Sequence, residues 1–235
     1  MLGRQQQIPA RALTWHSVRD RIRDPSLSAL LVLEILIVFV TAPLAAEGLP
    51  LAEIVVDVLT WTMVAIIIVL SDRWGAITSV FIALILISAD LWSSAGWPTA
   101  TARLLGYCGS ILGFSALTWV VAHAVFAPGR ITVQRVQGAV VAYLNLAMIF
   151  ASVYRLIAEL NPAAFNKPTA PAGSSELGTM LYFSLVTLTT TGYGDITPID
   201  PFARGVVNLE AVIGQFYLAV TIARLVAQEM ADRRQ

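Results

Sequence analysis

Six long apolar segments divide the 235-residue chain, and their lengths give the first indication of its architecture. Each is long enough to cross a hydrocarbon core of about 30 Å as an α-helix, which satisfies its own backbone polar groups in lipid. The pattern therefore predicts an all-α polytopic membrane protein with six transmembrane helices. Their approximate limits are 28–46, 51–71, 74–93, 103–127, 132–159 and 202–229.

The stretch 161–201 differs from the short connections between most of the other segments. Its semi-apolar middle, from Ser175 to about Leu188, would make about 21 Å of helix and is too short to span a membrane. Ser174 or Ser175 can cap its start, and Glu176 suits the first turn of a helix. We therefore expect a re-entrant half-helix followed by irregular backbone that is buried in protein or lines water.

Composition agrees with a membrane protein, because only 13% of the residues are charged and 57% are hydrophobic. Soluble domains carry roughly a quarter charged residues. The charges of the 15 basic and 15 acidic residues cancel, so no nucleic-acid partner is expected. Membrane lipid is the partner that the apolar segments imply. A signal peptide is a poor interpretation of 28–46, because a long polar region precedes this apolar run and Glu34 lies inside it.

The arginines set the orientation. With both termini in the cytoplasm, most arginines fall on the inner side, whereas the outer side keeps mainly Arg103, Lys167 and Arg204. This asymmetry follows the positive-inside rule, so we expect a multi-pass plasma-membrane protein. Residues 1–27 would be cytoplasmic, and an interfacial amphipathic helix and a solvated segment both remain open for them.

A short glycine-containing sequence follows the half-helix, Thr-Thr-Gly-Tyr-Gly over residues 190–194. Glycine adopts positive φ easily, and alternating it with residues of ordinary handedness lets successive carbonyls point the same way. Four such strands around one axis would present stacked rings of oxygens. These rings would replace the water shell of a cation, whose unaided entry into low dielectric costs roughly tens of kcal/mol.

The sequence Tyr-Phe-Ser-Leu-Val-Thr-Leu-Thr-Thr-Thr-Gly-Tyr-Gly-Asp, residues 182–195, resembles the pore helix and selectivity filter of potassium channels. The resemblance implies a potassium-selective, non-enzymatic channel that assembles as a homotetramer, with K+ as permeant ion and no cofactor. It places a hydroxyl of Thr190 at the innermost ion site and Gly194 at the outer mouth. It further implies that the ion-coordinating carbonyls are those of Thr190, Thr191, Gly192 and Tyr193.

The positions that support the filter depart from that family's usual pattern. Tyr182 and Phe183 stand where many members have two tryptophans, and Val186 stands where some have a glutamate. Phenylalanine and valine cannot share a proton with Asp195. Asp195 must therefore find another partner.

The chain as a whole resembles six-helix tetrameric cation channels. This resemblance implies a four-helix, sensor-like peripheral domain over 28–127 and a pore domain over 128–235. Gly214 falls where the family has a hinge glycine, although close helix packing is an alternative role. Leu218, Ile222 and Val226 share its helical face, so they would line a cavity and form a hydrophobic gate, or else pack against other helices.

Voltage gating is not expected, because a voltage sensor carries arginine at every third position of its fourth helix. Steep gating needs about 3–4 charges per subunit. In this chain Arg103 is the only arginine at these positions. The series reads Arg103, Gly106, Gly109, Leu112, Ser115 and Thr118.

The charges inside the apolar segments are expected to find partners at membrane depth. We expect Asp90 to pair with Arg103 near the outer surface and Arg155 to pair with Glu210. The alternatives to a potassium channel are a nonselective cation channel and a non-conducting accessory subunit. A Gly-x-Gly-Asp intramembrane protease is disfavoured, because the chain lacks the Tyr-Asp pair that such an enzyme uses. The stimulus that opens the pore is left open, and a separate gating partner is one of the alternatives.

Overall fold

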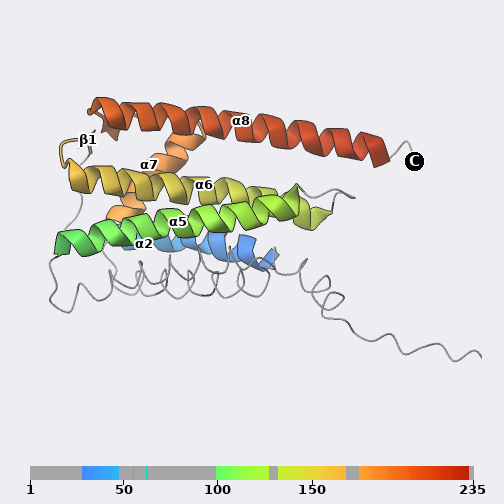
Figure 1. Ribbon diagram of the computed structural model, residues 1–235, viewed down its shortest axis with the longest axis horizontal. Helices are drawn as coiled ribbons and strands as arrows, with labels where there is room; N and C mark the ends of the chain where they lie inside the picture. Colours follow the sequence, from blue (N-terminus) through green and yellow to red (C-terminus); the bar gives the residue numbers. More distant parts are fainter. Residues whose placement is uncertain are drawn as a thin grey trace, which may run out of the picture.

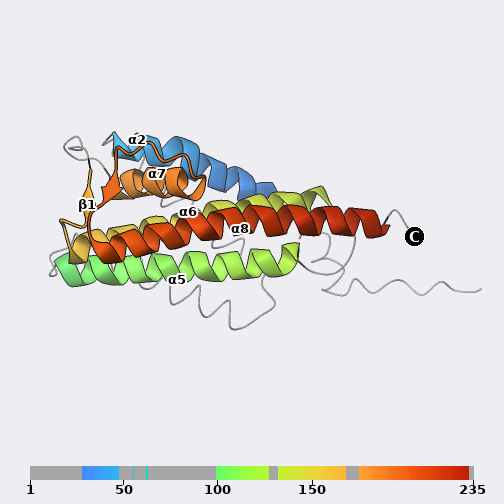
Figure 2. The ribbon, with the colours of Figure 1, turned by 90° about the horizontal axis from the view of Figure 1, so that it is seen from above.

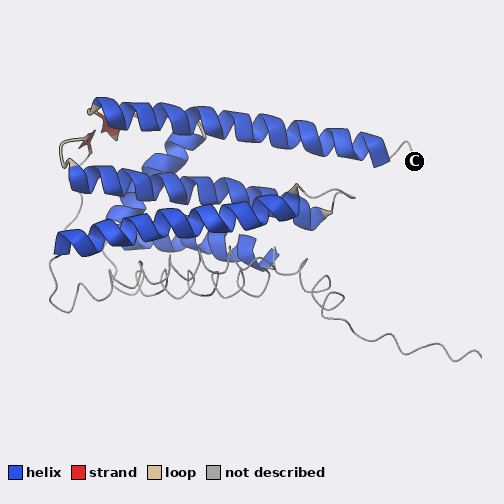
Figure 3. Cartoon of the chain, viewed as in Figure 1, coloured by secondary structure: helices blue, strands red, loops and turns tan. Residues whose placement is uncertain are grey.

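The computed structural model describes residues 28–47, 99–126, 132–167 and 175–232, together with Val55 and Thr62. Within these ranges the regular structure is helical apart from one short ribbon of two strands, and loops join the elements (Figure 3). Residues 28–36 are α-helical and continue through the π-helix η1 (Ile37–Thr41) into α2 (Ala42–Ala46). The predicted first apolar segment is therefore a helix.

Three further helices run alongside one another, and a fourth, shorter one crosses between them (Figure 1). The long helices are α5 (Thr99–Val125), α6 (Val133–Leu160) and α8 (Pro201–Asp232). The short helix α7 (Glu176–Leu188) contacts α6, α8 and α2, and seen from above it lies beside α2 (Figure 2). The expected half-helix is thus present, held among helices rather than exposed on one side.

Three described helices are long and apolar enough to cross a membrane, and they are parts of α5, α6 and α8. Their limits are Arg103–His123, Val133–Leu160 and Pro201–Ala227. The predicted segments 51–71 and 74–93 and the cytoplasmic segment 1–27 lie essentially outside the described residues. Six membrane spans therefore stay a prediction, whereas the described residues are mostly helical and include three helices that are long and apolar enough to span a membrane.

Helix α6 occupies the centre of the described chain. In the apolar stretch of α6, 61% of the residues are buried, whereas only 17% are buried in the apolar stretch of α8. Ala147 and Ala151 have no exposed surface, and such small side chains let neighbouring helices approach closely. Helix α8 instead exposes large apolar side chains such as Phe202 and Phe216, which lipid or other helices would have to cover.

The ribbon and the cap of α8 fix the connections around α7. Strand β1 (Phe165–Asn166) pairs antiparallel with β2 (Thr197–Pro198). The Asp200 carboxylate accepts from the amides of Phe202 at 2.9 Å and Ala203 at 3.1 Å, which caps the start of α8. At α7 the expected capping bond is absent from the described contacts, since Ser175 holds the cap position without a side-chain cap hydrogen bond.

Candidate functional site

The backbone after α7 alternates in handedness. Thr190, Gly192 and Gly194 have φ of 56°, 61° and 80°, whereas Thr191 and Tyr193 between them do not have positive φ. An L-residue in this conformation is disfavoured by roughly 1–2 kcal/mol, so Thr190 is held there by its surroundings. The sequence predicted the two glycines and missed Thr190, because nothing in a threonine signals left-handed backbone.

The amides of this loop are fixed to the end of α7. The amides of Thr191 and Gly192 donate to the Val186 carbonyl at 2.9 and 3.3 Å, and the Thr190 amide donates to the Thr187 carbonyl at 2.9 Å. Within the described residues, no hydrogen bond ends on a carbonyl between Thr190 and Gly194. Val186 therefore supports the loop with its backbone oxygen, and the loop carbonyls are left available.

The loop is also open to the surroundings in the single chain. Every residue from 189 to 195 is exposed. A Cβ added at Gly192 or Gly194 would meet nothing within 4 Å, so a neighbouring atom of the same chain does not exclude a side chain there. Exposed, unpaired carbonyls on a fixed strand are suited to hold a cation if further oxygens come from other copies.

Tyr182 lies against the outer part of the loop. Its ring stacks on that of Tyr193 with centroids 6.3 Å apart and an interplanar angle of 7°. Its hydroxyl lies close enough to the Asp195 carboxylate for the two groups to interact electrostatically. Tyr182 is therefore the candidate among the described residues for the other partner of Asp195, and the pairing itself stays a prediction.

Phe183 points to the opposite side of α7, into the core. Its ring lies 5.0 Å from that of Tyr154 and 5.8 Å from that of Phe165, the latter pair edge-to-face. Such aromatic pairs add about 0.5–1.5 kcal/mol beyond the area that they bury. Phe183 therefore joins α7 to α6 and to the ribbon, and it does not reach Asp195.

The inner end of α7 is seated between α6 and α8. The Tyr143 hydroxyl donates to the Leu188 carbonyl at 3.2 Å, and a Cβ built on Gly214 would lie 2.5 Å from that same oxygen. Gly214 therefore allows close packing, the alternative role considered for it. Helix α8 runs unbroken through this point, and the hinge stays a prediction.

Next to Gly214, Gln215 reaches the start of the loop. Its side-chain amide donates to the Thr190 hydroxyl oxygen at 3.3 Å. The sequence analysis missed Gln215, although a polar residue on a membrane-spanning helix is a recognised signal of function. Gln215 and Thr190 together form a polar site at the inner end of the loop.

The predicted gate residues lie on an uncovered part of α8. The side chains of Leu218, Ile222 and Val226 are 40%, 60% and 53% exposed in the single chain. Their exposure leaves the gate a prediction. On the same half of α8, the Arg224 guanidinium donates to the Phe126 carbonyl at 2.5 Å and lies over the Phe126 ring, which ties α8 to the end of α5.

The predicted pairing of Arg155 with Glu210 is wrong. The Arg155 guanidinium lies over the Tyr107 ring, 4.4 Å from its centroid. Glu210 instead contacts the Tyr154 hydroxyl and the Ser184 hydroxyl. Consecutive helical residues point about 100° apart, so Tyr154 and Arg155 of α6 face different neighbours.

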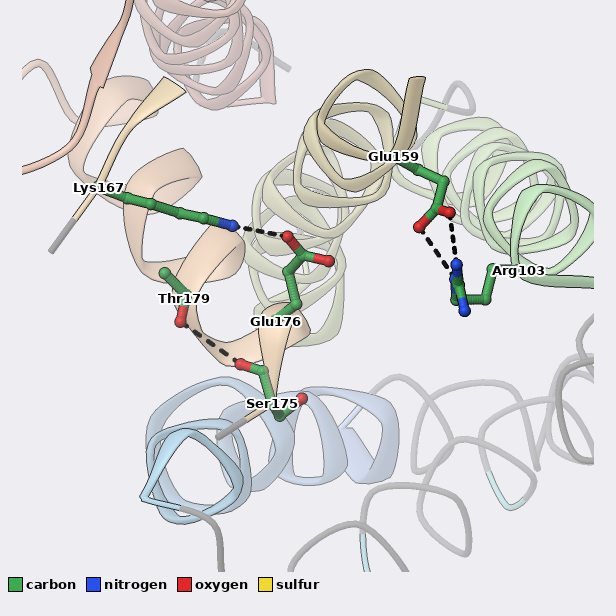
Figure 4. Close-up of polar contacts among 6 residues, drawn as sticks. All are labelled: Arg103, Glu159, Lys167, Ser175, Glu176 and Thr179. Atoms are coloured by element: carbon green, nitrogen blue, oxygen red, sulfur yellow. Dashed lines mark hydrogen bonds and ion pairs between the residues drawn. The ribbon is translucent and has the colours of Figure 1, made fainter. Parts of the chain in front are cut away.

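Arg103 pairs with a residue that the sequence analysis did not name. It forms a two-pronged contact with Glu159 at 3.0 and 2.7 Å, which joins α5 to α6 (Figure 4). The expected partner, Asp90, lies outside the described residues. Figure 4 also shows Lys167 on Glu176 at 2.8 Å, an ion pair that links the ribbon to the start of α7.

Comparison with known proteins places this site in a family. The family described as "Ion channel" matches residues 139–230, which contain most of α6, all of α7, the loop and most of α8. Protein LctB of Bacillus caldotenax is 31% identical over 119 residues, covering 49% of this chain and 87% of that protein. The chain belongs to the family of protein LctB, and its residues 139–230 carry an ion channel domain. No solved structure matches it significantly.

Two further relatives are similar to parts of the chain. Protein LctB of Geobacillus stearothermophilus is 31% identical over 127 residues, which cover 53% of this chain and 91% of that protein. The potassium voltage-gated channel protein shk-1 of Caenorhabditis elegans is 46% identical over 46 residues. That match covers only 20% of this chain and 9% of the relative, so it concerns one segment of an ion channel.

Proposed function

We propose that this ion channel is potassium-selective and that four copies assemble around the loop 190–194. The observation that carries the proposal is the alternation of positive φ at Thr190, Gly192 and Gly194 on a strand whose amides are held by Val186. Amides fixed behind the strand leave the carbonyls as the free polar groups. The segment shared with a potassium voltage-gated channel protein supports the same ion.

In the proposed mechanism the carbonyl oxygens of Thr190, Thr191, Gly192 and Tyr193 replace the water shell of K+. The Thr190 hydroxyl completes the innermost site, where Gln215 orients it. The C-terminal end of α7 carries partial negative charge and stabilises a cation below the loop. Ions pass because successive sites bind strongly enough for entry and weakly enough for exit.

Homotetramer formation is part of the proposal, because one chain supplies only one strand of oxygens. The exposed apolar side chains of α8 would form the surface that meets other copies and lipid, since only 17% of the residues in the apolar stretch of α8 are buried in the single chain. Leu218, Ile222 and Val226 would then line the inner cavity. Both termini would lie in the cytoplasm, with the loop toward the outer side of a plasma membrane.

Ion flux into liposomes tests the proposal. Purified full-length protein is reconstituted, and uptake of Rb+ (a potassium substitute) and of Na+ is measured under matched gradients, with the mass of the detergent-solubilised assembly as a second measurement. We expect Rb+ uptake at least about tenfold above Na+ uptake, given carbonyl-ring selectivity, and a mass of four chains. Equal fluxes would identify a nonselective cation channel, and absent flux would identify an accessory subunit.

We also expect conductance to depend only weakly on voltage. Moving one charge through the whole field gives about 2.3 kcal/mol per 100 mV, and Arg103 is already committed to Glu159 at the outer end of α5. Arg103→Gln should leave the conductance–voltage relation unchanged in planar bilayers. Its effect on stability should stay below about 1 kcal/mol, since the pair is partly exposed.

Glu159→Gln is the matched control, because it removes the same ion pair and leaves the arginine in place. The two variants should behave alike if Arg103 serves only that pair. A steep conductance–voltage curve that flattens in Arg103→Gln alone would show that Arg103 senses voltage.

A further inference from the structure

A fully buried carboxyl group joins the three helices around the loop. Glu210 of α8, Tyr154 of α6 and Ser184 of α7 are 0% exposed. One Glu210 oxygen contacts the Tyr154 hydroxyl and the other contacts the Ser184 hydroxyl. The Ser184 hydroxyl also lies 2.9 Å from the Ala147 carbonyl oxygen of α6. This cluster is separate from the ion sites, and the proposed conduction mechanism does not use it.

Counting hydrogens decides the form of the carboxyl group. A serine hydroxyl has one hydrogen, and a carbonyl oxygen can only accept. If Ser184 donates to Ala147, its contact with Glu210 needs a hydrogen that Glu210 supplies. If Ser184 instead donates its hydrogen to an ionised Glu210, no hydrogen is left between the Ser184 hydroxyl oxygen and the Ala147 carbonyl oxygen, and these two oxygens face each other unbonded. Only a protonated Glu210 satisfies all three contacts.

The surroundings of Glu210 agree with a neutral group. The ion pairs among the described residues are Arg103–Glu159 and Lys167–Glu176, and neither reaches Glu210. Arg155, the partner predicted from the sequence, lies over the Tyr107 ring. A buried carboxylate without a cation is strongly disfavoured, and such a group takes up a proton instead.

We infer that Glu210 carries a proton, donates it to Ser184 and thereby sets the position of α7 behind the loop. The complete chain of donors runs from Tyr154 to Glu210, from Glu210 to Ser184 and from Ser184 to Ala147. Ser184 lies two residues before Val186, whose carbonyl holds two amides of the loop. Glu210 is therefore a positioning residue for the loop, and this part of the inference rests on the proposed filter.

Infrared spectra of the full-length protein in liposomes test the protonation. We expect the protonated carboxylic acid absorption at neutral pH to lose one component in Glu210→Gln, while a component from Glu34, which is buried without a described hydrogen bond, remains. Glu159→Gln is the matched control, because Glu159 is paired with Arg103 and should contribute no such band. An unchanged absorption in Glu210→Gln would overturn the inference. This measurement does not depend on ion selectivity, so it separates failure of the inference from failure of the proposed function.

Ser184→Ala gives a second test that keeps the carboxyl group. Removing the acceptor of the Glu210 proton should shift the frequency of the Glu210 component without abolishing it. A Glu210 component that keeps its frequency in Ser184→Ala would show that the proton is not donated to Ser184. This variant keeps the inference testable if Glu210→Gln does not assemble.

Ion flux tests the positioning role. A glutamine can donate to Ser184 and accept from Tyr154 as a protonated glutamate does, so Glu210→Gln should keep Rb+ uptake within about twofold of the parent. Glu210→Leu has no polar group and should lower uptake at least about tenfold, since it leaves the buried Tyr154 hydroxyl without a partner and Ser184 with only the Ala147 carbonyl. Parent-like uptake and selectivity in Glu210→Leu would overturn the positioning role.

Discussion

Replacing Gly192 by alanine should abolish Rb+ uptake. Gly192 has φ of 61°, a conformation that disfavours an L-residue by roughly 1–2 kcal/mol, and the proposed channel would bear this strain in four subunits at once. If the strand relaxes to ordinary handedness, the Gly192 carbonyl turns away from its neighbours and an ion site is lost. We expect uptake to fall by at least about a hundredfold, as the summed strain of about 4–8 kcal/mol implies.

Gly205→Ala is the matched control for this substitution. Gly205 lies in helical backbone of α8, and a Cβ added there meets nothing within 4 Å. Alanine in a helix is favoured over glycine by roughly 1 kcal/mol, so Gly205→Ala should conduct like the parent. Parent-like Rb+ uptake and selectivity in Gly192→Ala would contradict the proposed role of the alternating backbone.

Local sequence patterns predicted much of this arrangement. Length and hydropathy were sufficient to predict the helices among the described residues, because a membrane leaves few alternatives for a long apolar segment. The half-helix was predicted over Ser175 to about Leu188 and is Glu176–Leu188. The positive φ at Gly192 and Gly194 was predictable as well, since glycine is the residue that adopts it at little cost.

The missed features depend on contacts between distant parts of the chain. The partners of Glu210 come from two other helices, 56 and 26 positions away in sequence, and opposite charge wrongly favoured Arg155 over two hydroxyls. Positive φ at Thr190 follows from how α7 ends, not from the residue itself. Asp200 is different, because an aspartate directly before a proline was a readable signal for the start of α8 that the analysis did not use.

The two roles considered for Gly214 require different geometry. A hinge requires a helix that bends, whereas close packing requires that no side chain fits. A Cβ at Gly214 would lie 2.5 Å from the Leu188 carbonyl oxygen and 2.9 Å from its Cδ1. Backbone cannot move aside as the end of a side chain can, so any added methyl group must displace α7 or α8.

Gly214→Ala should therefore destabilise the pore region and reduce ion selectivity. Overpacking costs about 1–3 kcal/mol, occasionally more, and exceeds the gain of roughly 1 kcal/mol from alanine's helix propensity. We expect a lower thermal midpoint of unfolding and a smaller ratio of Rb+ to Na+ uptake, because α7 supplies the carbonyl oxygens that hold the loop amides. Gly205→Ala again serves as the control, since it changes the same helix by the same methyl group in open space.

A double variant tests which atom causes the effect. Leu188→Val shortens the side chain and relieves the Cδ1 contact, but it leaves the carbonyl oxygen in place. Gly214→Ala combined with Leu188→Val should therefore remain impaired, because the 2.5 Å approach is to backbone. If Gly214→Ala instead keeps parent-like selectivity and stability while single-channel recordings show an altered open probability, the glycine acts as a hinge and its packing role is secondary.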